Sequence, residues 1–212
     1  MIVLSFLEKV FLEFFPNSCP LCGKRIGIKE LLCQTCEKEI KNGPLPIVHK
    51  SKFFTAYFYG KYESKLRDLI LAYKNGKHWR LSKVIAYCMA DLITRYPSSA
   101  DLLTWVPSSY KATEERGFET MRLVAENLSK ALKIPAKKLL ESKAKTSRRG
   151  IAGNDRIRIV DGMIYPVGQI SGDIVLIDDV FTTGKTVAEC VHVLKNNGAR
   201  NVTVYCLAIV QR

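Results

Sequence analysis

Residues 174–210 constrain the fold more than any other part of this chain, because a strand, a polar turn, a helix and a second strand follow one another directly. Residues 174–177 are an apolar, β-branched run, typical of a strand that is buried on both faces. Apolar side chains then repeat at helical spacing, at Val187, Cys190, Val191 and Leu194. Asn197-Gly198 ends this helix, and residues 202–210 are expected to form another buried strand. The succession predicts an α/β unit with parallel strands.

The turn inside this unit has the composition of an anion-binding site. Free backbone N–H groups and the helix dipole favour negative charge there, and the small residues Thr182, Thr183 and Gly184 let a phosphate approach closely. Asp178 and Asp179 would repel a bare phosphate, but they suit sugar hydroxyls or the outer shell of Mg²⁺. The turn therefore predicts a ribose-phosphate pocket, and the alternative is an Asp-rich turn that only caps a helix.

Two common phosphate-binding loops do not match the sequence. Gly184-Lys185-Thr186 is like the end of a Walker A loop, but the first glycine of that motif would fall at Asp179. No G-x-G-x-x-G follows any expected strand. Both nucleotide-binding motifs are therefore excluded.

Residues 175–186 resemble the phosphoribosyl pyrophosphate (PRPP) motif of type I phosphoribosyltransferases, in which an apolar strand and two acids precede Thr-Thr-Gly-x-Thr. By this resemblance Asp178 and Asp179 bind the ribose hydroxyls. The same resemblance assigns the remaining PRPP contacts of this motif to Val180, Thr182, Thr183, Gly184, Lys185 and Thr186.

Four cysteines near the start of the chain form two C-x-x-C pairs that are separated by ten residues: Cys19, Cys22, Cys33 and Cys36. This spacing lets four thiolates converge on one structural zinc ion. A redox dithiol would need only one pair, and a disulfide framework belongs to a secreted protein. A disulfide-bonded or degenerate pair is the remaining alternative. The other three cysteines lie in apolar runs and are expected to be buried.

The net charge of +13 favours a polyanionic partner, whether nucleic acid, a membrane surface or a phosphorylated metabolite. Residues 137–158 carry eight Lys or Arg against two acids, and residues 61–83 carry seven against two. Solvated helix faces and a mobile loop are the alternative explanation for these two stretches. We expect a cytoplasmic protein, since no run of about twenty apolar residues is present. The apolar first fifteen residues predict an amphipathic helix packed on the protein, with peripheral contact to the inner membrane left open.

The linker at residues 43–46 divides the chain into a zinc module with its apolar helix (residues 1–45) and an α/β domain (residues 46–212). The remaining patterns predict, in order, a strand at 53–59, a helix ending at Asn75-Gly76, a helix at 79–96, a strand at 102–106, a helix at 119–132 and a short strand at 139–140. Residues 142–158 are expected to be a long loop of the kind that forms active-site lids. Residues 159–167 are expected to form an edge hairpin. Together these elements predict a three-layer, largely parallel α/β sheet.

Residues 106–118 carry a second resemblance, to the "VP…RGFNQ" segment of the ComF family of phosphoribosyltransferase-like competence proteins. The segment around Lys74 and Gly76, and the C-x-x-C pairs after an N-terminal helix, are similar to the same family. Glu119 and Thr120 depart from the family's usual Asn-Gln. The resemblance implies a type I phosphoribosyltransferase-like fold with a small N-terminal zinc module.

The ComF resemblance also implies binding of PRPP with Mg²⁺ and of single-stranded DNA, in DNA uptake for natural transformation with other uptake proteins as partners. The catalytic candidates are Asp178, Asp179, Arg116 and Lys145, and further PRPP contacts are assigned to Ser108, Ser109 and Lys74. The DNA-binding candidates are Lys143, Arg148, Arg149, Arg156, Lys77 and Arg80. Tyr73, Trp79 and Tyr110 are available for base stacking, and a place in the core is the alternative for these aromatic residues. Phosphoribosyl transfer stays open, because no residue identifies an acceptor base. The alternative is a nucleotide-salvage phosphoribosyltransferase without a DNA role, against which the zinc module argues.

Overall fold

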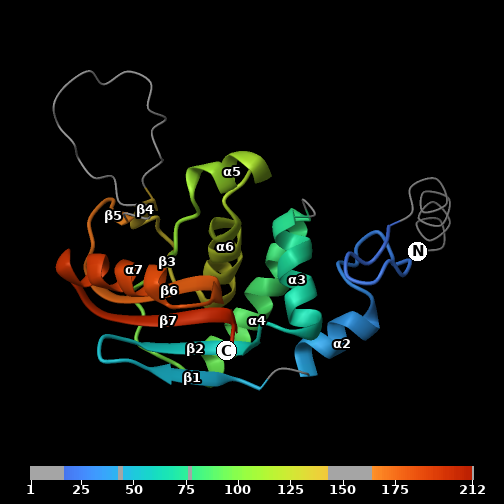
Figure 1. Cartoon of the computed structure of the whole chain (residues 1–212), viewed down its shortest axis with the longest axis horizontal. Helices are drawn as coiled ribbons and strands as arrows, with labels where there is room; N and C mark the ends of the chain where they lie inside the picture. Colours follow the sequence, from blue (N-terminus) through green and yellow to red (C-terminus); the bar gives the residue numbers. More distant parts are fainter. Residues whose placement is uncertain (1–16, 43–44, 76–77, 143–163, 212) are drawn as a thin grey trace.

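The computed structural model describes residues 17–42, 45–75, 78–142 and 164–211 (Figure 1). Its elements follow in the order α2 (Gln34–Asn42), β1 (Ile47–Lys50), β2 (Thr55–Lys61), α3 (Ser64–Asn75), the 3-10 helix η1 (Trp79–Leu81), α4 (Ser82–Arg95), β3 (Leu102–Trp105), α5 (Tyr110–Arg116), α6 (Thr120–Leu132), β4 (Leu140–Ser142), β5 (Ile164–Pro166), β6 (Gly172–Phe181), α7 (Lys185–Asn196) and β7 (Ala199–Ile209). Strands and helices therefore alternate, as the sequence predicts.

Five strands form the main sheet, in the order β1-β2-β7-β6-β3. β2, β7, β6 and β3 are parallel, and β1 runs antiparallel to β2 at one edge. The apolar strands β6 and β7 are paired at the centre, where a strand is covered on both faces. Since the four strands are parallel, the loops that follow their carboxyl ends gather along one edge of the sheet.

Each face of the sheet is covered by helices, which gives the predicted three layers. Val175 and Ile177 belong to a core that includes side chains of α3, α4 and α6. Ile174 and Leu176 point to the other face and pack with α7. The alternation follows from the two-residue period of a strand. α7 lies next to β6 on one face of the sheet, and α4 and α6 cover the other face (Figure 1).

The cysteine-containing segment packs onto the first of these cores. Cys19, Ile26 and Leu32 share one buried cluster with side chains of α3 and α4. In Figure 1 this blue segment and α2 lie beside α3. The boundary at residue 45 stays a prediction.

Two local predictions were wrong. β6 does not end at Ile177 but continues to Phe181, because pairing with β7 extends through the two acids. Residues 107–118 are not only a loop but contain the short helix α5. Of the hairpin predicted at 159–167, residues 159–163 lie outside the described residues, and β5 pairs antiparallel with β4 in a two-stranded sheet. The edge strand β1 was not predicted.

Several predictions lie outside the described residues: the helix at 1–15, the greater part of the lid loop, and the side chains of Lys77, Lys143, Lys145, Arg148, Arg149 and Arg156. In the part of the chain that the structure does describe, no helix combines the length and the apolar character that crossing a bilayer requires.

Candidate functional site

The two acids of β6 lie at a cleft of about 200 Å³ at the carboxyl edge of the sheet. Residues from α3, the loop after β3, α5, the start of α6 and β6 line this cleft: Lys74, Val106, Pro107, Ser108, Ser109, Ala112, Arg116, Thr120, Met121, Asp178 and Asp179. Six of the residues predicted to contact PRPP or to act in catalysis are in this set, although they come from distant parts of the sequence.

Asp179 forms an ion pair across the cleft with Lys74. The Lys74 Nζ lies 2.8 Å from Asp179 Oδ1 and donates a hydrogen bond to it. Asp179 is 7% exposed, so its carboxylate depends on this ammonium group for compensation. The pair fixes the last turn of α3 against the end of β6.

Asp178 also lines the cleft and is half-buried there. Its Oδ1 accepts a hydrogen bond of 2.8 Å from the backbone N–H of Asp179. Burial, followed by the negative charge of Asp179, raises the pKa of Asp178 to about 8. In the free protein this carboxyl group therefore holds a proton near neutral pH. A ligand that supplies cations or hydroxyl donors would favour its ionised form.

The loop after β3 is shaped by the caps of α5. The Ser109 Oγ accepts a hydrogen bond of 3.3 Å from the backbone N–H of Ala112 and so caps the helix. Gly117 ends the helix in the left-handed conformation, with its N–H bonded to the Thr113 carbonyl. These caps place Arg116 in the last turn of α5, on the lining of the cleft.

Tyr73 has a role that the sequence did not predict. It was a candidate for base stacking, but its side chain is fully buried, so it has no surface to offer a base. Its hydroxyl donates a hydrogen bond of 2.6 Å to the Thr120 carbonyl. The bond ties the turn of α3 that carries Lys74 to the first residue of α6. Burial raises the pKa of this phenol well above its usual range, so it remains a donor.

The predicted phosphate loop follows β6 directly and leads into α7. Thr182, Thr183, Lys185 and Thr186 are exposed, and Val180 is half-buried. Gly184 occupies the N-cap position with a φ of 73°. A β-carbon at this position would collide with the ring of Phe181. Glycine is thus required both for the backbone angle and for the space, and the first N–H groups of α7 face the loop.

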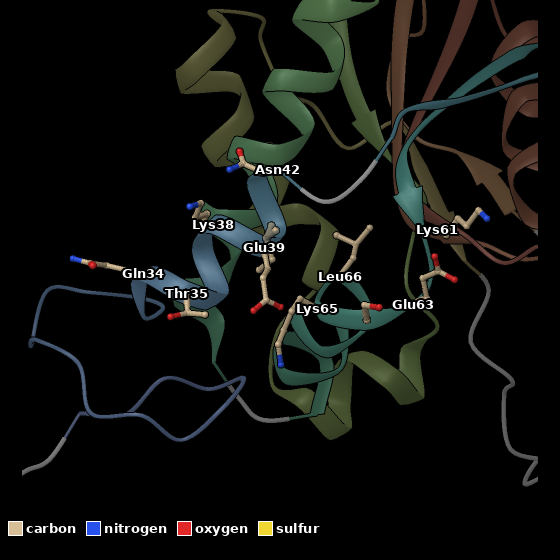
Figure 2. A pocket seen from close by; sticks show the side chains of 11 residues that line it. Gln34, Thr35, Lys38, Glu39, Asn42, Lys61, Glu63, Lys65 and Leu66 are labelled. Carbon is tan, nitrogen blue, oxygen red and sulfur yellow. The ribbon is translucent and has the colours of Figure 1, made fainter.

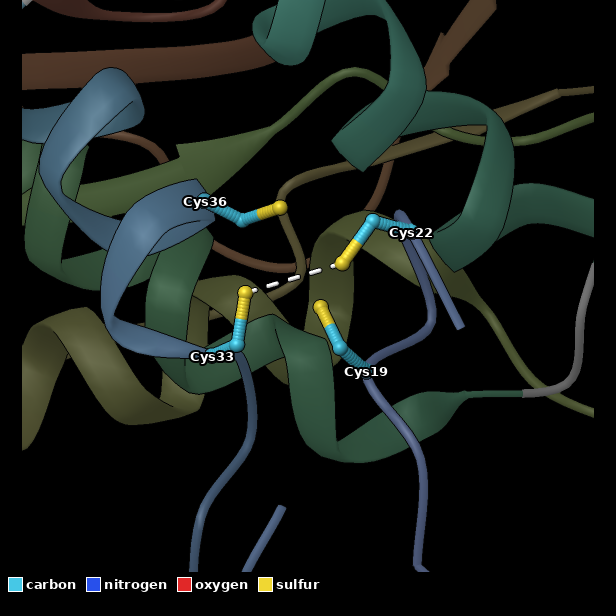
Figure 3. A group of neighbouring side chains, drawn as sticks. All are labelled: Cys19, Cys22, Cys33 and Cys36. Atoms are coloured by element: carbon cyan, nitrogen blue, oxygen red, sulfur yellow. Dashed lines mark hydrogen bonds between the residues drawn. The ribbon is translucent and has the colours of Figure 1, made fainter. Parts of the chain in front are cut away.

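The four cysteines converge as the zinc prediction requires (Figure 3). All four Sγ atoms lie within 4.8 Å of one another, and those of Cys22 and Cys33 are 3.6 Å apart. A tetrahedral site with Zn–S distances of about 2.3 Å separates its sulfurs by about 3.8 Å, so the geometry fits zinc. A backbone hydrogen bond with Cys36 lowers the pKa of Cys33 to about 7, which favours the thiolate that zinc binds.

Arg80 is the one DNA-binding candidate whose position is described. It is exposed on η1 and lines a separate cavity beside the zinc module, together with Trp79. Trp79 is 55% exposed and is available for stacking, as the sequence predicts. Nothing is described of the Tyr110 side chain.

A cavity of about 800 Å³ lies between α2 and α3 and is not the site of the acids. Figure 2 shows the side chain of Glu39 on α2 extending toward Lys65 on α3. None of the predicted PRPP-binding residues lines it. We place the chemistry in the smaller cleft, because only that cleft combines the two acids with the cations of α3 and α5.

No family model matches the chain. Among curated proteins, competence protein ComFC of Streptococcus pneumoniae is 25% identical over 94% of this chain and 84% of its own length. ComFC of Bacillus subtilis is 26% identical over 89% and 76%, and competence protein F of Haemophilus influenzae is 22% identical over 93% and 99%. Over most of its length the chain is therefore similar to competence proteins of the ComF family. Of the solved structures, the purine phosphoribosyltransferase of Pyrococcus horikoshii superposes with a TM-score of 0.36 at 24% identity, covering 62% of this chain and 75% of its own.

The order of elements in this ComF-like protein confirms the predicted type I phosphoribosyltransferase-like fold with a cysteine module at the N-terminal side. Parallel strands form the sheet, two acids lie at the end of β6, and a loop leads from them into α7. The structure brings three of the four segments that carried the resemblance to one cleft: the loop after β3, the end of β6 and the end of α3 at Lys74. The fourth, the cysteine module, lies beside α3.

Proposed function

We propose that the ComF-like protein binds PRPP together with Mg²⁺ in the cleft at the end of β6. The observation that carries the proposal is the convergence of Asp178, Asp179 and Lys74 with the loop after β3 around one cavity. Two acids on β6 and two cationic side chains, on α3 and α5, match a ligand that carries both hydroxyl donors and phosphates.

Each part of the ligand has chemically matched groups in this proposal. The carboxylates of Asp178 and Asp179 accept hydrogen bonds from the ribose hydroxyls. Arg116 and the hydroxyls of Ser108 and Ser109 receive the pyrophosphate, and residues 182–186 receive the 5-phosphate at the start of α7. Lys145 would complete the site from the lid loop.

The Mg²⁺ ion fits the donor set of the cleft, since carboxylate oxygens are its preferred protein ligands. It would be held through the ligand's own oxygens next to Asp178 and Asp179. Bound there, the ion supplies charge neutralisation to the pyrophosphate group. Its positive charge would also lower the raised pKa of Asp178, so binding is expected to release a proton.

Phosphoribosyl transfer would break the bond between ribose C1 and a pyrophosphate oxygen, with a nucleophile forming the new bond at C1. Arg116 and Lys74, which line the cleft, would stabilise the departing negative charge. No described side chain identifies an acceptor base. A nucleotide-salvage phosphoribosyltransferase without a DNA role is therefore the second candidate, and the resemblance to competence proteins favours the first.

We further propose that the protein binds single-stranded DNA and acts in DNA uptake, with other uptake proteins as partners. The support is the similarity over most of the chain to proteins named competence protein ComFC and competence protein F, together with the net charge of +13. Arg80 and Trp79, next to each other on η1, offer a cation and an exposed ring to a strand.

Isothermal titration with PRPP and Mg²⁺ tests the first proposal. Wild type should bind with measurable heat, and the double substitution Asp178→Asn and Asp179→Asn should abolish it. Asp68→Asn is a matched control, since this carboxylate lies on α3 outside the cleft and pairs with Lys65. No heat from wild type, or equal binding by the double variant, would refute the PRPP site.

A further inference from the structure

We propose that the cavity between the zinc module and η1 is the slot in which a base of single-stranded DNA stacks. This inference rests on the proposed DNA binding and names its location, apart from the PRPP cleft. The cavity measures about 250 Å³ and is lined by Asn17, Ser18, Pro20, Glu30, Leu31, His78, Trp79, Arg80 and Leu81. Among the described residues it shares no lining residue with the cleft of the two acids.

The shape and the apolar content of this slot suit a planar ring. Trp79 forms one side and keeps 55% of its surface exposed, although it is flanked by the fully buried Leu81. Pro20 and Leu31, both half-buried, contribute apolar surface from the zinc module. An exposed indole beside small apolar surfaces is the arrangement on which bases stack without sequence preference.

The rim of the slot carries the cations that a phosphate backbone needs. Arg80 and His78 are exposed on either side of Trp79, and Arg80 carries a fixed positive charge. On the zinc module, Ser18 lines the slot and forms a β-bridge with Arg25, which is also exposed. A cation on η1 and a second cation paired with Ser18 favour a single-stranded nucleic acid over an apolar protein segment.

One acid lies among these cations, but it is engaged in the module itself. Glu30 Oε2 accepts a hydrogen bond of 2.9 Å from the backbone N–H of Gly27. The Glu30 carbonyl and the Gly27 carbonyl both accept from the side chain of Asn17, at 3.4 and 2.8 Å. These bonds shape the module wall of the slot.

Zinc would hold that wall in place. Ser18 and Pro20 flank Cys19, and Leu31 lies two residues before Cys33, so two of the four thiolates anchor the segments that line the slot. The zinc module therefore gains a function in this proposal: it positions one side of a base-stacking site against η1.

The test is fluorescence anisotropy of a labelled oligothymidylate of about 16 nucleotides, across a salt series, with the zinc-loaded full chain. Trp79→Ala should weaken binding about 5- to 150-fold, the range for loss of one stacked base, and Trp79→Phe should retain part of the affinity. Tyr87→Ala is the matched control. Tyr87 on α4 is similarly exposed (53%), but its ring lies beneath the ammonium group of Lys41 on α2, outside the slot.

Arg25→Ala and Arg80→Ala should each reduce the slope of log K against log salt by about 0.7, as expected for one phosphate contact of a single strand. Arg122→Ala, on the exposed face of α6, should leave the slope unchanged. None of these variants should alter PRPP binding. Acrylamide should quench the fluorescence of Trp79 in the free protein, and the oligonucleotide should protect it.

The outcomes separate the two proposals. If wild type binds no oligonucleotide at low salt, DNA binding itself is refuted, and the slot with it. If wild type binds but Trp79→Ala binds equally well, with the zinc content and circular dichroism of wild type, only the slot is refuted. Loss of self-association in Trp79→Ala with unchanged DNA affinity would assign this surface to a second copy of the chain and would also overturn the proposal.

Discussion

Replacing Asp178 by Asn should stabilise the free protein while it weakens ligand binding. The pKa of Asp178 is raised to about 8, because burial and the nearby Asp179 charge disfavour its ionised form. In the unfolded chain the same group titrates near its ordinary value, about 3.9. The folded state therefore binds this proton more tightly, so wild-type stability is greatest below the unfolded pKa and is lost as pH rises through 8. Asparagine is of nearly the same shape and does not titrate.

The size of the effect follows from these two pKa values. Each pH unit above the unfolded pKa costs the folded wild type about 1.4 kcal/mol of unfolding free energy. The buried carboxyl group of Asp178 therefore destabilises wild type by at most about 4 kcal/mol at pH 7. Burial of the Asn amide costs about 1–3 kcal/mol itself. We expect a net gain of about 1–3 kcal/mol at pH 7, or about 2–12 °C in Tm for a chain of this size, and no gain near pH 4.

Thermal denaturation of wild type and Asp178→Asn from pH 4 to pH 8 measures this directly. Asp173→Asn is a control of opposite sign, since hydrogen bonds from Arg200 and Asn201 lower the pKa of Asp173. That carboxylate contributes stability above its unfolded pKa, so its replacement should destabilise the protein at neutral pH. If the gain in Tm for Asp178→Asn does not grow with pH, or if Tm falls at pH 8, the pKa of Asp178 is not raised by burial and the reasoning is refuted.

Three further predictions concern the same elements. Gly184→Ala should lower stability by about 1–3 kcal/mol in chemical denaturation, through backbone strain and collision with Phe181, and weaken PRPP binding. Gly168→Ala, with a similar φ of 72° but open space around it, should cost less and leave binding intact. Lys74→Met should destabilise the protein by about 1–3 kcal/mol by leaving Asp179 unpaired, and adding Asp179→Asn should restore part of that loss; additive effects would contradict the pairing. Native mass spectrometry should find one zinc ion per chain in wild type and none after Cys36→Ser, and a metal-free wild type would contradict the four-thiolate site.

The segments that the sequence predicted well are those in which local pattern and tertiary packing agree. Residues 174–177 are apolar enough to be central in any sheet, and the helix that became α7 has both a clear stripe and a glycine before it. The two C-x-x-C pairs needed no tertiary information, because their spacing alone brings four thiolates together.

Other features depend on contacts that no local pattern contains. β6 continues past its apolar run because β7 pairs with it as far as Ile209, which a single strand cannot reveal. α5 is only one to two turns long and depends on the Ser109 cap and on Gly117. Tyr73 could be either a stacking residue or a core residue by its type, and only its position between α3 and α6 shows that it is a buried anchor. The closeness of Lys74 to Asp179 spans 105 residues of sequence.

The central claim is that the end of β6 and the loop after β3 form one PRPP site. A crystal structure of the protein with PRPP and Mg²⁺ tests it most directly. We predict the ribose hydroxyls at Asp178 and Asp179, the 5-phosphate at residues 182–186, and the pyrophosphate between Arg116 and the loop after Pro107. PRPP bound in the larger cavity between α2 and α3, or no bound ligand at saturating concentration, would contradict the account.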